Sequence, residues 1–126
     1  MIEVAAAIIF IEDKILCLKR GYSKYDYVSY KYEFPGGKLK NNETPVSALK
    51  REIKEELSIN IKVFNHIASE KHKDEKIDVN VHYFLCESLN DNIILSEHED
   101  MKWIQKNDLK KFKMAPGDSK IIKYLD

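Results

Sequence analysis

Cysteine is scarce in this chain: Cys17 and Cys86 are its two cysteines, and 69 positions separate them. Neither has a second cysteine or a histidine near it at the spacing of a metal site. The chain is therefore no disulfide-stabilised scaffold. Each cysteine lies inside a segment with the character of a β-strand. We expect two buried free thiols in a reducing compartment, and hence a cytoplasmic protein.

The chain also lacks an excess of charge of either sign, because 21 lysines and arginines balance 21 aspartates and glutamates. Binding to polymeric nucleic acid requires a basic surplus that neutralises many phosphates. We therefore expect no polymeric nucleic acid among the partners of this protein. Any polyanion that it handles should be small and held at one local site.

Long hydrophobic runs are absent as well. The apolar stretch Val4–Ile11 has eight residues, whereas a membrane-spanning helix needs about 20. No basic segment precedes the stretch and no small-residue cleavage site follows it, which argues against a signal peptide. The stretch is typical of a buried strand, so we expect no membrane association.

The sequence does contain enough apolar material for one α/β domain over residues 1–126. Its 44% hydrophobic content excludes a disordered tail or a collagen-like fibre, and its length supports a core without a structural metal. We expect strands at Val4–Ile11, Lys14–Lys19, Asn60–His66, Ile77–Cys86, Ile93–Leu95 and Met101–Ile104, a strand end and turn at Glu33–Gly37, a helical turn at Asp108–Phe112, a closing helix at Asp118–Leu125 with Ile121, Ile122 and Leu125 inward, and an exposed tyrosine-rich loop at Gly21–Tyr32.

The strongest helix prediction covers Thr44–Leu57. Thr44 is a suitable N-cap and Pro45 a suitable first helical residue. At about 100° per residue, the apolar side chains form one stripe and three glutamates form an adjacent arc. The stripe consists of Val46, Leu49, Ile53 and Leu57, and the acidic arc of Glu52, Glu55 and Glu56.

The acidic arc requires a compensating positive charge. Its carboxylates repel one another, and they lie toward the helix C-terminus, where the helix dipole also disfavours anions. Arg51 can reach Glu55 but cannot neutralise all three glutamates. A hard divalent cation shared with substrate phosphates can do so. The geometry favours a metal site and leaves a solvated acidic face as the alternative.

A glycine turn precedes this helix, and the two segments together resemble a known family. Gly37, Glu43 and the run from Arg51 to Ile59 match eight of the nine specified positions of the Nudix box over 23 residues. The box reads G-x5-E-x7-R-E-U-x-E-E-x-G-U, where U is a bulky aliphatic residue. Ser58 stands where the family has a glycine, which ends the helix in a left-handed conformation. We expect this serine to cost about 1 kcal/mol of stability, or to shift the cap, without a loss of chemistry.

The resemblance covers nearly the whole chain and extends to the MutT-like branch of the family. The segment from Glu33 to Lys38 is similar to the approach to the box in that branch. The segment from Glu97 to Trp103 is similar to a late loop that carries a catalytic glutamate, and Ala115–Leu125 to a base-reading C-terminal segment. The implied fold is an α/β/α sandwich around a mixed β-sheet.

The resemblance implies a Mg²⁺ site, with Mn²⁺ as a substitute, in which the metal is shared with substrate phosphates. Its ligands would be the Gly37 carbonyl and the carboxylates of Glu52, Glu55, Glu56 and Glu97. The catalytic residues would be Glu97, Glu52 and Glu56, with Glu97 as the general base and Glu99 and Glu52 as competitors for that role.

The resemblance also assigns roles outside the metal site. Glu43 and Arg51 would form a structural pair that ties the loop to the helix. Arg20, Phe34, Lys38 and Asp118 would contact substrate. Asp118 stands where the MutT protein has an asparagine that reads a purine, but after Pro116-Gly117 it is also a suitable helix N-cap. Phe34 and Tyr83 could stack on a base or lie in the core, and His98 is expected to be a loop histidine that binds no metal.

The function implied is that of a Mg²⁺-dependent nucleoside triphosphate pyrophosphohydrolase of MutT type. It would cleave an oxidised nucleotide such as 8-oxo-dGTP to the monophosphate and pyrophosphate, a nucleotide-pool form of DNA repair. The alternatives are a CTP or dCTP pyrophosphohydrolase, which the carboxylate of Asp118 favours, and a nucleotide sensor without catalysis. The expected partner is a small nucleotide, and the protein is expected to be a monomer or a homodimer.

Overall fold

The computed structural model describes residues 1–25, 29–73, 75 and 77–125. The elements follow one another as β1 (Ile2–Ile11), β2 (Lys14–Lys19), β3 (Tyr32–Glu33), β4 (Gly36–Lys38), α1 (Pro45–Leu57), β5 (Ile61–Lys73), β6 (Asp78–Ser88), β7 (Asp100–Gln105), the 3₁₀ helix η1 (Lys106–Lys111), α2 (Pro116–Ser119) and the 3₁₀ helix η2 (Ile122–Tyr124).

Strand β1 lies at the centre of a mixed sheet. It runs parallel to β6, from Ile2 opposite Val79 to Ile9 opposite Cys86, and antiparallel to β4. The sheet has the order β3-β2-β1-β6-β5, with β4 paired to β1 and β7 to β2. A strand with partners on both sides and a layer on each face is buried along its middle, here from Ala5 to Ile9, which explains the continuous apolar run from Val4 onward.

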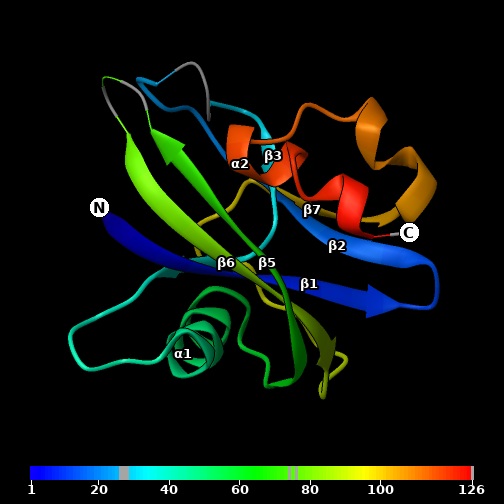
Figure 1. The fold of residues 1–126 in the computed structure, drawn as a ribbon. Helices are drawn as coiled ribbons and strands as arrows, with labels where there is room; N and C mark the ends of the chain where they lie inside the picture. Colours follow the sequence, from blue (N-terminus) through cyan, green and yellow to red (C-terminus); the bar gives the residue numbers. More distant parts are fainter. Residues whose placement is uncertain (26–28, 74, 76, 126) are drawn as a thin grey trace.

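Helices cover both faces of this sheet, so the molecule has the predicted α/β/α sandwich (Figure 1). Helix α1 packs on one face, against Ala5, Ala7 and Ile9 of β1. The α2, η1 and η2 segments lie on the opposite face, where Ala6 and Ile8 point. Because successive side chains of a strand point to opposite faces, the single run of β1 supplies both cores.

Helix α1 begins and ends where the sequence predicts. The Thr44 hydroxyl accepts from the Ser47 backbone N–H, and Ser47 Oγ accepts from the Thr44 N–H, so the two residues form a capping box. At the other end Ser58 adopts the left-handed conformation, with φ 58° and ψ 33°, and its N–H donates to the Lys54 carbonyl. The cap is therefore not shifted, and serine takes the conformation that favours glycine.

The structure corrects the prediction of a strand at Ile93–Leu95. This segment forms no ladder with a neighbouring strand; it crosses the end of α1, where the Ile94 N–H donates to the Leu57 carbonyl. Ile93 and Leu95 still pack against the core on the α1 face. The alternation of apolar residues therefore indicated that one side of the segment is buried, but it did not indicate pairing with a neighbouring strand.

The closing helix predicted at Asp118–Leu125 is also wrong as a continuous element. The chain forms the short helix α2 and then η2, and the N–H groups of Ile121 and Leu125 donate three residues back, to the carbonyls of Asp118 and Ile122. This is the bonding of a 3₁₀ helix, which persists for only a few residues. Ile121 and Leu125 are buried as expected.

The prediction of a turn at Gly36-Gly37 is wrong, because Gly36–Lys38 forms strand β4, which pairs with β1. The other predicted elements differ only at their ends. Strand β2 has the predicted bounds, β7 contains the predicted Met101–Ile104, and η1 covers most of the expected helical turn. Strand β5 continues to Lys73, well past the predicted end at His66. Three residues of the tyrosine-rich loop, 26–28, lie outside the described residues, so the exposed-loop prediction is tested only on either side of them.

Cys17 and Cys86 are buried free thiols. Burial raises the pKa of each thiol to about 12, so both stay protonated and unreactive. Among the described residues, the structure has no helix with the length and hydrophobicity of a membrane span.

Candidate functional site

Two adjoining cavities lie between α1, the end of β2 and the C-terminal segment. Arg20, Glu33 and Gly36 line both cavities, which therefore share a border. The acidic pocket, of about 340 Å³, is lined by Arg20, Gly21, Tyr22, Glu33, Gly36, Glu52, Glu56, Glu97 and His98. The apolar pocket, of about 300 Å³, is formed by β1 and β6 residues together with Phe34, Gly37, Lys38, Tyr83, Gly117 and Asp118.

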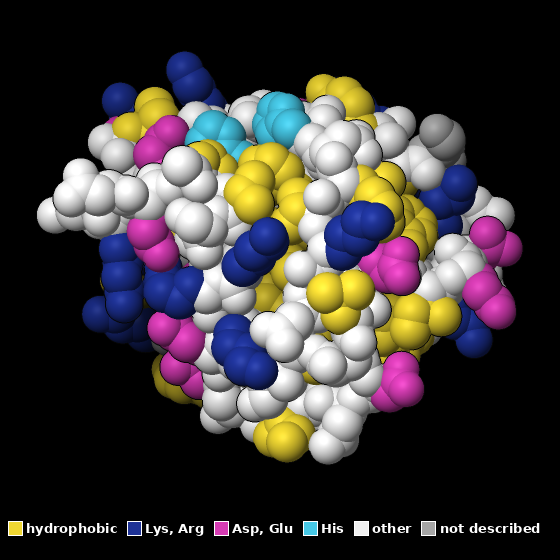
Figure 2. Space-filling view, turned by 90° about the horizontal axis from the view of Figure 1, so that it is seen from below, with side chains coloured by type: hydrophobic (Ala, Val, Ile, Leu, Met, Phe, Trp, Pro, Cys, Tyr) yellow, Lys and Arg dark blue, Asp and Glu magenta, His cyan; other side chains and the backbone are white. Residues whose placement is uncertain are grey.

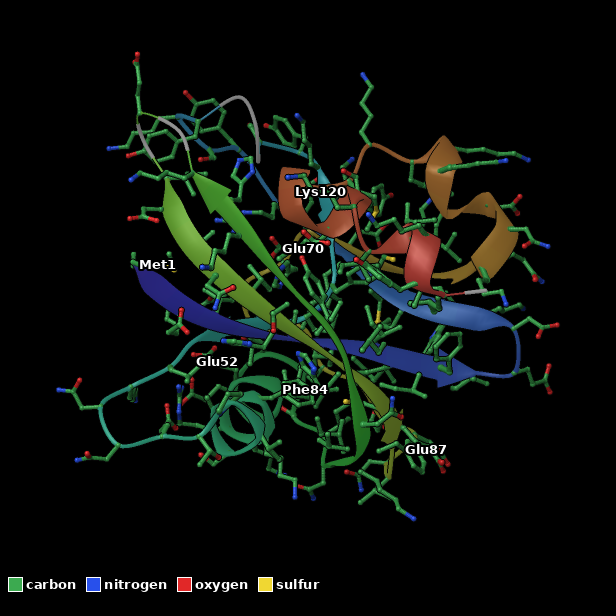
Figure 3. All side chains as sticks on the ribbon, viewed as in Figure 1. Met1, Glu52, Glu70, Phe84, Glu87 and Lys120 are labelled. Carbon is green, nitrogen blue, oxygen red and sulfur yellow. The ribbon has the colours of Figure 1, made fainter. Side chains whose placement is uncertain are left out.

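Two glycines of β4 allow the box helix to approach the sheet closely. Gly36 has φ 155°, and a Cβ on it would overlap the backbone carbonyl oxygen of Ala5. A Cβ on Gly37 would overlap the carboxylate of Glu52 instead. Figure 3 shows Glu52 on the side of α1 that faces the sheet. The glycines therefore bring the carboxylate of Glu52 against the backbone of β4.

Glu56 is the most deeply buried of the three box glutamates, and its carboxylate faces the acidic pocket. Gly36 N–H donates to its Oε1 at 3.3 Å. Burial, with a smaller contribution from the neighbouring carboxylates of Glu33 and Glu52, raises the pKa of Glu56 to about 7 against the opposing effect of His98. The raised pKa shows that the charged form of this buried carboxylate is poorly solvated in the protein.

His98 lies between two carboxylates of the acidic pocket. The sequence did not predict this contact. The His98 side chain is 7% exposed; Nε2 lies 2.8 Å from Glu33 Oε2 and Nδ1 lies 3.5 Å from Glu56 Oε2. Burial alone lowers the pKa of His98, but the hydrogen bond to Glu33 and the charges of Glu33 and Glu56 outweigh it, so the pKa is raised. No spacing in the sequence signals this contact, because Glu33 lies 65 positions away.

The structure separates the two loop glutamates that compete as general base. Glu97 is exposed and lines the acidic pocket together with Glu52 and Glu56. Glu99 instead pairs with Lys19 Nζ at 3.6 Å, and its N–H donates to the Lys19 carbonyl. Of the two, Glu97 therefore has direct access to a ligand in the pocket.

Arg51 joins the loop before α1 to the helix. Its Nε and Nη2 donate to the two carboxylate oxygens of Glu43, at 2.7 and 2.9 Å, and Nη2 also donates to the Lys38 carbonyl. The hydrogen bonds from Arg51 lower the pKa of Glu43 to about 2. Such a two-pronged contact fixes the geometry of the loop.

The box carboxylates fit a hard divalent cation in their chemistry, although the described residues do not include a preformed cluster of three or more His, Cys, Asp or Glu ligands. Arg51 Nη1 holds Glu52 at 2.9 Å and Glu55 at 3.2 Å. Glu56 keeps its proton to an unusually high pH. Carboxylate oxygens are the ligands that Mg²⁺ prefers, and a cation would supply the charge that this pocket lacks.

Asp118 closes the apolar pocket from the C-terminal segment. Its Oδ2 accepts from the Phe34 backbone N–H at 3.0 Å and its Oδ1 from the Tyr83 hydroxyl at 2.6 Å. Burial raises the pKa of Asp118 to about 7; nearby Glu33 adds to the shift, and the two hydrogen bonds oppose it. The interpretation of Asp118 as a helix N-cap is wrong, because it lies inside α2, whose N-cap is Ala115.

Phe34 and Tyr83, two aromatic residues that line the apolar pocket, are also part of the hydrophobic core. Phe34 and Tyr83 are almost fully buried, and their rings meet edge to face at 6.2 Å. Both line the apolar pocket. A flat ligand would therefore meet two aromatic rings whose positions are fixed by packing.

The two basic candidates lie at the cavities in different ways. Arg20 is exposed, borders both pockets and lies 3.4 Å from Glu33. Lys38 is exposed at the border of the apolar pocket. Tyr22, at the start of the tyrosine-rich loop, is 78% exposed and lines the acidic pocket. Each of the three can reach a ligand without a change of the fold.

Comparison with known proteins agrees with this arrangement. The NUDIX domain family matches residues 1–125. The chain is 30% identical to the CTP pyrophosphohydrolase of Escherichia coli over 97% of its own length and 89% of that protein's. It is 35% identical to the 8-oxo-dGTP diphosphatase of Buchnera aphidicola over 95% and 89% of the two lengths.

A solved structure shows the same fold. The MutT NUDIX hydrolase from Burkholderia pseudomallei superimposes with a TM-score of 0.87 at 21% identity, over 99% of this chain and 98% of that one. The domain match, the full-length relatives and the box carboxylates of Glu52 and Glu56 at one pocket lead to a single assignment. The chain belongs to the Nudix hydrolase family.

Proposed function

We propose that this protein is a Mg²⁺-dependent nucleoside triphosphate pyrophosphohydrolase that cleaves an oxidised nucleotide such as 8-oxo-dGTP to the monophosphate and pyrophosphate. One observation carries the proposal. The acidic pocket, lined by carboxylates, shares a border with the apolar pocket, which is closed by the buried carboxylate of Asp118. A nucleotide has the same two parts, a polyphosphate and a base. The Nudix assignment supports the reaction class.

The polyphosphate would occupy the acidic pocket. Glu52, Glu55, Glu56, Glu97 and the Gly37 carbonyl would hold Mg²⁺, or Mn²⁺ in its place. When bound, the metal neutralises the phosphate oxygens and lowers the pKa of a bound water. The protein's own part is to keep its ligand oxygens on one side of the cavity. The close approach of the Glu52 carboxylate to Gly37 supports this role.

Glu97 is the general base in this proposal. Its side chain is exposed and borders the pocket that Glu52 and Glu56 line, so it can accept a proton from an attacking water. Arg20, at the border of the two pockets, would contact a phosphate, and Lys38 another. Glu43 and Arg51 would act indirectly, by fixing the loop that carries Lys38.

The base would enter the apolar pocket between Phe34, Tyr83 and Asp118. An ionised Asp118 accepts hydrogen bonds only, whereas its protonated form also donates one. A guanine presents a ring N–H and an amino group, which both suit an acceptor. The 35% identity to an 8-oxo-dGTP diphosphatase over 95% of the chain supports the oxidised purine. The reaction would then serve nucleotide-pool sanitation and DNA repair in the cytoplasm.

A specific observation also favours CTP or dCTP as the substrate. Asp118 is a carboxylate, and the amino group of cytosine is a donor that a carboxylate accepts. A relative over 97% of this chain is named CTP pyrophosphohydrolase. The pyrimidine reading is therefore the second candidate for the same pocket.

The test is pyrophosphate release from a panel of 8-oxo-dGTP, dGTP, CTP, dCTP and ADP-ribose, with and without Mg²⁺. We expect metal-dependent turnover that Glu56→Gln lowers by about 10³-fold, because a ligand of the charge-neutralising ion is lost. Lys54→Gln, an exposed change on the same helix, is the matched control and should retain full turnover.

The panel also decides between the two bases. A kcat/KM for 8-oxo-dGTP above that for CTP and dCTP supports the oxidised purine, and the reverse order supports the pyrimidine reading. Turnover that does not need a divalent metal, or that survives in Glu56→Gln, would contradict the assignment of the acidic pocket.

A further inference from the structure

A second cluster of polar side chains lies on the α1 face of the sheet, outside both pockets. Glu3 comes from β1, Asn80 and His82 from β6, and Ser69 and His66 from β5. These residues line neither the acidic nor the apolar pocket. Figure 2 views the molecule from the α1 side and shows histidine side chains together at one edge of that face.

Three atoms of this cluster form a nearly equilateral triangle. Glu3 Oε1 lies 3.2 Å from His82 Nε2 and 3.2 Å from Asn80 Nδ2, and Asn80 Nδ2 lies 3.4 Å from His82 Nε2. The register explains the triangle, because Glu3 is directly opposite Asn80 and Ala5 is opposite His82 on the parallel pair β1–β6. Side chains two positions apart on β6 therefore face the same neighbour on β1.

These separations match the ligand spacing of a small divalent metal. Zinc bonds of roughly 2.0–2.1 Å in a tetrahedron place neighbouring ligand atoms about 3.3–3.4 Å apart. A half-turn of the Asn80 amide exchanges its nitrogen and oxygen and brings Oδ1, a metal ligand, to the third corner. As the side chains stand, Asn80 Oδ1 and Glu3 Oε2 are both buried without a hydrogen-bond partner.

The outer hydrogen bonds of the cluster suit a metal-binding histidine. His82 Nδ1 lies 2.7 Å from Ser69 Oγ, and Ser69 Oγ lies 2.8 Å from His66 Nε2. If His82 donates to Ser69 and Ser69 donates to His66, the Nε2 of His82 carries a free lone pair toward Glu3. A ligating histidine commonly donates its other ring N–H in this way, which fixes its orientation.

We infer that Glu3, Asn80 and His82 form a binding site for a borderline divalent metal ion such as Zn²⁺, separate from the acidic pocket. One imidazole nitrogen and two oxygens are a ligand set that suits Zn²⁺, Co²⁺ and Ni²⁺ better than Mg²⁺. The fourth position opens to solvent, since the side chains of Glu3 and His82 are 43% and 19% exposed. Because the ligands come from β1 and β6, a bound ion would join the two central strands.

The experiment measures Zn²⁺ binding by calorimetry in metal-free protein that carries Glu56→Gln, with Mg²⁺ in excess, so that the acidic pocket does not contribute. Co²⁺ absorption in the visible range reports the ligand geometry. The variants are Glu3→Gln and His82→Gln, and His72→Gln is the matched control because it removes a histidine of β5 that lies outside the cluster, at the apolar pocket. Circular dichroism checks that each variant is folded.

We expect one Zn²⁺ per chain, an affinity that falls by about tenfold or more in Glu3→Gln and in His82→Gln, and an affinity in His72→Gln equal to that of the parent. Zn²⁺ should also raise the melting temperature of the parent protein and not that of His82→Gln. Equal affinities in the parent and in both ligand variants, or no binding by the parent, would overturn the site. The experiment does not measure nucleotide turnover, so its outcome is independent of the proposed hydrolase activity.

Discussion

The acidic and the apolar pocket adjoin, but the protein builds them in different ways. Two of the four carboxylates of the acidic pocket, those of Glu52 and Glu56, come from one turn of α1, so the sequence already places these two together. The apolar pocket combines β1, β6 and α2, and its central contact joins Phe34 and Asp118 across 84 positions. Local sequence therefore dictates the α1 side of the first pocket, and the tertiary fold dictates the second.

The two pockets also differ in how their charges are balanced. In the acidic pocket the carboxylates of Glu33, Glu52 and Glu56 act on one another, and one histidine offsets them in part. In the apolar pocket a single buried carboxylate receives two hydrogen bonds. The first arrangement suits a cation and a polyphosphate, and the second suits one hydrogen-bonding edge of a base. Changes in the acidic pocket should affect all substrates alike, while changes in the apolar pocket should reorder them.

After Glu56→Gln, the largest effect is expected from Gly37→Ala. A Cβ at this position overlaps the Glu52 carboxylate, the end of a flexible side chain, so the fold should persist while Glu52 moves. We expect kcat/KM to fall by about 10²-fold for every nucleotide, because a displacement of about 1 Å at a reactive site costs that much. Steady-state kinetics on the nucleotide panel measures the loss. A loss confined to one nucleotide would show that Gly37 acts on base selection.

Asp118→Asn should change which nucleotide the enzyme prefers without abolishing turnover. An amide donates as well as accepts, so it no longer matches a base edge made only of donors. We expect the ratio of kcat/KM values for 8-oxo-dGTP and CTP to change by about tenfold or more. Tyr83→Phe is the control, since it removes a donor to Asp118 and leaves the carboxylate in place. An equal fall for both nucleotides would assign Asp118 a structural role.

The stability of the metal-free protein should fall as the pH rises from about 4 to 7. The pKa of Asp118 is raised from 3.8 to about 7 in the folded state, so the folded protein binds more protons than the unfolded chain in this window. At about 1.4 kcal/mol per pKa unit, ionisation of this one group costs up to about 4 kcal/mol. Urea unfolding of the wild type and of Asp118→Asn, in a chelator, measures the slope. Parallel pH profiles would contradict the raised pKa.

The smallest effect is expected from Ser58→Gly, far from the apolar pocket. Ser58 has φ 58°, a conformation that glycine adopts without strain. We expect a gain of about 0.5–1 kcal/mol in the free energy of unfolding and unchanged turnover. Thermal unfolding measures the gain, and Ser58→Ala should not reproduce it. A loss of activity would mean that the serine hydroxyl has a role in the acidic pocket.

The box helix shows how far sequence reasoning reaches. Thr44, Pro45 and the apolar stripe predict where α1 begins and which face it buries, because caps and periodicity act within a few residues. The Nudix motif names the glutamates for the same reason. The two glycines of β4 were predicted only as a turn, and the structure shows that Gly36 lies too close to the backbone of Ala5 to admit a side chain.

The C-terminal half shows where this reasoning ends. Apolar residues at Ile93–Leu95 and Ile121–Leu125 are correctly expected to be buried, but burial alone does not tell a strand or helix from an irregular segment that packs on a core. His98 is the residue of the acidic pocket whose contacts were not predicted. Its contacts with Glu33 and Glu56 exist only because β3, α1 and the loop before β7 meet at one cavity.

Local interactions and one helical period were sufficient to predict the acidic face of α1, and the resemblance to the Nudix box predicted the family and the sandwich architecture. The chemistry of Asp118 needed the tertiary structure. A side chain that reads as a helix cap becomes a buried carboxylate, held by a backbone N–H and a tyrosine hydroxyl from distant strands. Burial and long-range hydrogen bonds change the protonation of a group, and both depend on which segments pack together.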